Sequence, residues 1–147
     1  MGLRTEYISN LIVSYDDVQK MQTAQLAAYD YICGLKSYNE LVVVLGTAAT
    51  ILGLIFIKST AVGVAAGLTS LLSGMSSSEK ETLKDVTNAG VRGLASLSVY
   101  MYNNRTRYNL VKADFPFLKF VDENMTVVQG EPEITSVHNI DPPGWIV

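Results

Sequence analysis

The side chains that could take part in chemistry are few and lie far apart along the 147 residues of the chain. His138 is the only histidine and Cys33 the only cysteine, and neither has a partner nearby that would indicate a metal site or an activated nucleophile. The adjacent acidic residues at 16–17 and at 122–123 diverge on a helix or strand, so they are typical of caps and turns rather than of an acid–base pair. The glycines form no phosphate-binding pattern. We therefore expect no enzyme activity, no cofactor, no metal and no small-molecule substrate.

The dominant feature is an apolar segment, 41–78, in which Lys58 is the only charged residue. As a helix, 41–57 would reach about 25 Å, close to the roughly 30 Å of bilayer hydrocarbon. Its eleven Leu, Ile, Val and Phe residues favour a bilayer by roughly 3 to 7 kcal/mol, whereas 61–75 contributes about 2 to 3 kcal/mol. The sequence predicts an apolar helical hairpin, 41–75, with Lys58 at its tip, and leaves open whether lipid or protein covers it.

Small residues inside this hairpin favour close packing of its helices. Gly63 and Gly67 form a Gly-x-x-x-Gly, a spacing that suits helix pairs in lipid and packs equally well in a soluble bundle. The residues predicted to contact a membrane or another copy of the chain are Leu45, Leu52, Ile55, Phe56, Gly63, Gly67 and Leu71.

Two amphipathic helices, over 15–36 and 79–102, are expected to shelter the hairpin. The Ser-x-x-Glu patterns at 37–40 and 78–81 are capping boxes, which place helix starts there. Residues 1–13 fit either one or two helical turns or a short strand.

An aromatic and basic cluster follows the second of these helices. Tyrosines and arginines suit the headgroup layer of a membrane, but they also suit an ordinary solvated helix end or an RNA-facing patch. The predicted interfacial residues are Tyr100, Tyr102, Arg105 and Arg107.

The character of the chain changes at residue 113. Segments 117–121, 125–129 and 133–138 look like strands, and turn residues at 130–132 precede the last of them. The predicted architecture is therefore mainly α: a helical domain, 1–112, built as a bundle around the apolar hairpin, with an acidic β-hairpin tail, 113–147.

Net charge and targeting signals limit the classes of partner and the location that the sequence predicts. The net charge of −3 argues against nucleic acid, because phosphate binding needs a concentrated positive field. The first residues lack the apolar core of a signal peptide. The expected partners are a lipid bilayer or copies of the chain itself, and the expected location is a membrane, or the cytoplasm before assembly into an oligomer or particle.

Two resemblances bear on context. The stretch 108–130 is similar to the C-terminal part of small uncharacterised proteins of Gram-positive phages and prophages, through FPFLKFVD at 115–122 and VVQG at 127–130. It carries over no functional residue. By architecture alone, the hairpin looks like the central hairpin of colicin-type pore-forming domains, which wrap it in more helices than this chain has.

The first hypothesis is therefore a membrane-active protein that inserts its hairpin as a channel, pore or holin-like element. The alternative is a structural or assembly subunit, such as a phage particle component, whose hairpins pack in a homo-oligomeric core. A third reading is a toxin or regulator that acts through the aromatic and basic cluster.

Overall fold

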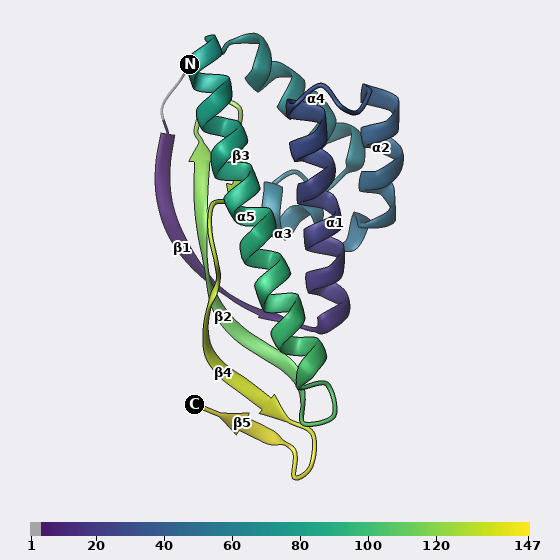
Figure 1. Cartoon of the computed structure of the whole chain (residues 1–147), viewed down its shortest axis with the longest axis vertical. Helices are drawn as coiled ribbons and strands as arrows, with labels where there is room; N and C mark the ends of the chain where they lie inside the picture. The colour runs from purple at the N-terminus through teal and green to yellow at the C-terminus, as the bar shows by residue number, and fades with distance from the viewer. Residues whose placement is uncertain (1–3) are drawn as a thin grey trace.

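The computed structural model describes residues 4–147, in which a curled antiparallel sheet of five strands packs against a layer of helices (Figure 1). Helices make up 53% of the fold and strands 26%, so the expectation of a mainly α bundle with a β-hairpin appendage is wrong, and the fold is α+β. The elements in chain order are β1 (Arg4–Val13), α1 (Tyr15–Ile32), α2 (Tyr38–Thr47), the 3-10 turn η1 (Ala49–Ile51), α3 (Leu52–Phe56), α4 (Ala61–Ser73), α5 (Ser77–Asn103), β2 (Tyr108–Phe120), β3 (Met125–Val128), β4 (Glu133–Asn139) and β5 (Gly144–Ile146).

The strand β2 organises the sheet. It pairs with β1 over ten residues on one edge, from Val13 opposite Val111 to Arg4 opposite Phe120. On its other edge it pairs first with β4 and then with β3, and β5 extends β4. The two ends of the chain thus form one sheet, and β2 passes through the predicted domain boundary between 112 and 113. Two strands about a hundred residues apart in the sequence leave no local periodicity that shows their pairing. The sequence therefore favoured an α-helical bundle.

A serine caps the start of α1, α2 and α5. The capping box at 37–40 is confirmed, with Ser37 as N-cap of α2. The box before α5 lies two residues earlier than predicted, at Ser76 and Glu79, because Ser76 also has a glutamate three residues ahead. The segment 1–13, for which the sequence left helical turns or a strand open, is the strand β1 from residue 4 onward. Its first three residues lie outside the described range.

The apolar segment is folded more tightly than a two-helix hairpin. Its first half is divided into α2, η1 and α3, and these end at Ile57, whose φ of 72° is rare for a β-branched residue. A new helix, α4, then follows its N-cap Thr60, whose hydroxyl oxygen accepts a hydrogen bond from the Gly63 N–H at 2.9 Å. The segment therefore consists of short helices that pack against α1 and β3.

The short strand β3 joins the sheet to the helices. The buried side chain of Gln25 in α1 donates to the Val128 carbonyl at 2.6 Å and accepts from the Val128 N–H at 3.0 Å, so it pairs with the free edge of β3. The Thr126 hydroxyl donates to the Ile55 carbonyl of α3 at 2.7 Å. Gly90 of α5 lets that helix lie directly against Val128, where no side chain would fit.

Candidate interaction surfaces

The large side chains predicted to meet lipid or another copy lie in the interior of the chain itself. Leu45, Leu52, Ile55 and Phe56 are 0% exposed and Leu71 is 1% exposed, and all belong to the core that α1, α5 and the sheet share. The chain itself therefore covers these large side chains, whereas Val43, Leu54 and Val62 of the same segment stay exposed.

The two glycines of the predicted helix-packing motif serve other contacts. A side chain at Gly67 would meet the Met125 sulfur at 2.7 Å, so this glycine packs α4 against β3 rather than against a second helix. Gly63 lies beside the Thr60 hydroxyl in the N-terminal turn of α4. Lys58, the predicted hairpin tip, is half-buried in the connection between α3 and α4.

One stretch of the described residues, Ala49–Ser73, is long and apolar enough to cross a membrane by length and composition alone. Its 25 residues include the bend at Ile57, and 39% of its most apolar window is buried inside the fold. The core helix of a soluble protein meets the same criterion, so this stretch is weak evidence for a membrane span.

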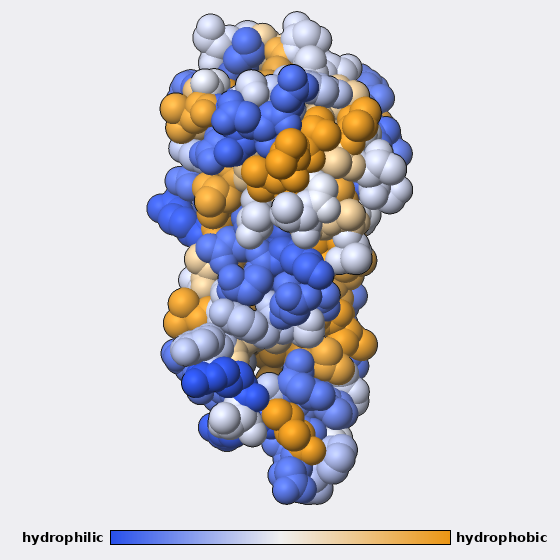
Figure 2. Space-filling view, turned by 90° about the vertical axis from the view of Figure 1, so that its right-hand side faces the viewer, coloured by the Kyte–Doolittle hydropathy of each residue, from blue (hydrophilic) through white to orange (hydrophobic). Residues whose placement is uncertain are grey.

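An apolar surface that the sequence did not predict lies over α1 and α2. Val43 is 71% exposed and lines a hollow of about 350 Å³, and Leu26 lines a neighbouring hollow of about 140 Å³. Both hollows include Lys36 and Val44, so they form one continuous face, called the α1–α2 apolar surface below. Figure 2 views this side of the molecule and shows apolar side chains gathered on its upper half. The signal in the sequence was the run of three valines in α2, which cannot all face one core.

The aromatic and basic cluster spans the C-terminal end of α5, with Tyr100 and Tyr102 in its last turn and Arg105 and Arg107 after it. The Arg105 guanidinium stacks over the Tyr102 ring at 4.1 Å and donates to the Tyr102 carbonyl at 2.8 Å. Arg107 lies over the Tyr108 ring at 5.0 Å and donates to its hydroxyl at 2.9 Å. Part of the donor capacity of both arginines is thus used within the chain.

The cluster lies near the C-terminal strand and away from the apolar helices. Tyr100 lines a hollow of about 270 Å³ beside the C-terminal strand β5. In Figure 1 the helices α2 and α4 occupy the upper half of the molecule, whereas α5 ends at the lower end. The cluster therefore lies apart from the apolar segment along the long axis of the molecule.

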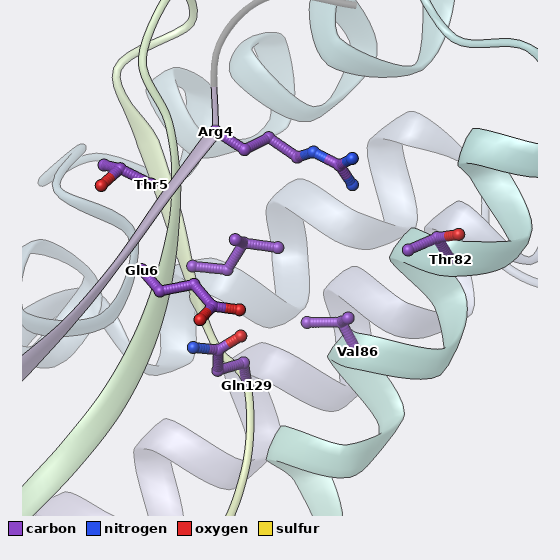
Figure 3. Close-up of a pocket in the computed structure, with 7 residues that line it drawn as sticks. Arg4, Thr5, Glu6, Thr82, Val86 and Gln129 are labelled. Atoms are coloured by element: carbon purple, nitrogen blue, oxygen red, sulfur yellow. The ribbon is translucent and has the colours of Figure 1, made fainter.

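A further hollow of about 380 Å³ lies between β1 and α5 (Figure 3). Arg4 and Glu6 extend from β1 toward Thr82 and Val86 of α5, with Gln129 beside them. It combines one cation, one carboxylate and apolar walls, and no set of like donors converges, so it specifies no ligand chemistry.

The residues first considered for chemistry are used in local contacts. His138 shares a hydrogen bond of 2.7 Å with the Asn109 side chain and packs edge-on against Trp145. Cys33 is half-buried at the C-terminal end of α1. Within residues 4–147, no three metal-ligating side chains are grouped so that they could hold an ion.

No protein-family model, no curated protein and no solved structure matches this chain.

Proposed function

We propose that the chain is a structural subunit that assembles with copies of itself. The observation that carries this proposal is the exposed α1–α2 apolar surface. A second observation opposes insertion of the apolar segment, because Leu45, Leu52, Ile55, Phe56 and Leu71 are buried within a single chain. These are the side chains that a bilayer would have to accommodate if the apolar segment were to insert.

The folded core already keeps these side chains away from water. Burying a large apolar side chain stabilises by about 1.5 to 3 kcal/mol, so these five side chains contribute roughly 8 to 15 kcal/mol. Lipid tails are as apolar as the core, so insertion would gain little more from the same side chains. Insertion would also break core contacts such as the hydrogen bond from the Thr126 hydroxyl to the Ile55 carbonyl, and this loss disfavours it.

The α1–α2 apolar surface is the face best suited to assembly. It presents Leu26, Val43 and Val44 to solvent, and it is bordered by Lys36 and by the acidic side chain of Glu40. An apolar centre with charges of both signs at its rim is typical of a specific protein interface.

Light scattering without detergent tests the proposal. We expect the purified chain to form a discrete oligomer, and Val43→Lys to reduce its mass because a lysine would enter the centre of the interface. Val62→Lys is the matched control, since Val62 is also an exposed valine, on α4, outside this surface. A wild-type chain that stays monomeric from micromolar to millimolar concentration contradicts the proposal.

The second candidate is the insertion of the apolar segment into a bilayer as a channel or pore. It is favoured by the composition of Ala49–Ser73 and by the exposure of Leu54 and Val62, on either side of the bend. Flotation with neutral and anionic vesicles, together with dye release, tests it. In this case Val62→Lys should reduce flotation while Val43→Lys leaves the soluble mass unchanged, the reverse of the pattern expected for assembly.

A further inference from the structure

The outer edge of β1 has no partner within the described part of the chain, and we propose that it pairs antiparallel with β1 of a second copy. The sheet would then continue across a two-fold axis. This inference rests on the proposed function, because it names one surface through which copies assemble.

The edge is long, regular and unprotected. β1 pairs with β2 over ten residues without a register shift, and Figure 1 shows it running along the outside of the molecule. It contains no proline and no lysine, and its two charged residues, Arg4 and Glu6, lie at one end. Ile8 is 69% exposed and Ile12 is 53% exposed. An edge with these properties is a template for another strand.

The other edges of the same sheet are covered or short. The side chain of Gln25 pairs with the edge of β3 through both the N–H and the carbonyl of Val128. β5 has only three residues and follows two prolines, at 142–143. The fold therefore limits pairing at two edges and leaves β1 available, which is the contrast expected if β1 is a docking edge.

The sequence of β1 favours a second copy as the occupant. Every second residue of an edge strand points its N–H and carbonyl outward. In an antiparallel pair with a two-fold axis, one residue lies opposite its own copy, so even-numbered residues pair with even-numbered ones and odd with odd. In the register that centres on Asn10, Asn10 of one copy lies opposite Asn10 of the other. Ile8 of each copy then lies opposite Ile12 of the other. On the other face, Tyr7 pairs with Val13.

In this ladder, from 7 to 13, the large apolar residues Ile8, Ile12, Tyr7 and Val13 meet one another, Asn10 meets its own copy, and Ser9 lies opposite Leu11. This register also leaves Arg4 and Glu6 outside the ladder, where their charges stay in water. The register that would bring Ile8 opposite itself pairs Arg4 with Ile12 and Glu6 with Asn10, so it buries charge against unsuitable partners.

Sedimentation equilibrium in the Val43→Lys background isolates the edge, because the α1–α2 apolar surface no longer contributes. We expect this variant to be a dimer. Adding Ile8→Lys and Ile12→Lys should raise the dimer Kd by at least about tenfold, because four lysines would meet across the axis. Ile8→Lys with Ile12→Glu should restore the dimer, since each lysine then faces a glutamate.

A cross-link tests the same register without relying on charge. In a chain with Cys33→Ser, Asn10→Cys should form a disulfide between copies, whereas Glu6→Cys, outside the ladder, should not. A Val43→Lys variant that is already monomeric, or a Lys/Lys variant that dimerises as well as its parent, overturns the edge pairing while the proposed function stands. A monomeric wild-type chain contradicts the proposed function itself.

Discussion

Replacing Gly90 by alanine should destabilise the fold, although alanine is the better helix former. A methyl group at Gly90 would lie 2.7 Å from the carbonyl carbon of Val128, where ordinary contact begins at 3.4 Å, and it would meet the Gln25 amide as well. Helix propensity alone would stabilise by about 1 kcal/mol. Overpacking costs about 1 to 3 kcal/mol, and displaced buried hydrogen bonds cost about 1 to 3 kcal/mol each. We expect a net loss of about 2 to 4 kcal/mol.

Urea unfolding followed by circular dichroism measures this change, with Gly46→Ala as the matched control. Gly46 lies in α2 and a methyl group there would meet no atom within 4 Å, so the same substitution should be neutral or stabilise by up to about 1 kcal/mol. The opposite signs at the two glycines are the informative result. If Gly90→Ala is as stable as the wild type, the close approach of α5 to β3 is not what holds the helical layer on the sheet.

Three further changes probe the same junction and one helix cap. Gln25→Leu should lower the free energy of unfolding by about 2 to 4 kcal/mol, because the N–H and carbonyl of Val128 lose their partner; an unchanged urea midpoint would contradict this. Thr126→Val should cost about 1 to 2 kcal/mol in the same assay by leaving the Ile55 carbonyl unpaired, and an unaltered stability would show that water replaces the hydroxyl. Hydrogen bonds at the α2 cap lower the pKa of Glu40 below its usual 4.5, so its contribution is present above that pH and is lost as the pH falls through the lower folded value. Glu40→Gln should therefore flatten the fall in the urea midpoint between about pH 5 and about pH 3, and an identical slope would count against the capping box as its cause.

The local features of the helices could be read from the sequence, because they depend on neighbours within one or two turns. The capping box at 37–40 and the extent of α4 and α5 follow from serine, glutamate and apolar spacing. The bend at Ile57 could not be read in this way. A β-branched residue at positive φ is disfavoured locally, so it occurs only where the surrounding contacts impose it.

The misjudged fold class has one cause, the pairing of β1 with β2, and the same sheet helps to bury the large side chains of the apolar segment within the chain, one of the alternatives that the sequence left open. Without that sheet, the apolar segment has too few helices around it, and lipid or sister copies are the natural cover. With it, β3 is brought to the helices, where Met125 meets Gly67 and Thr126 bonds to Ile55. Gln25 lies in the buried stripe of α1, and a buried polar side chain needs a partner. Its partner is the backbone of Val128, so this interruption of the hydrophobic pattern lies where β3 meets α1.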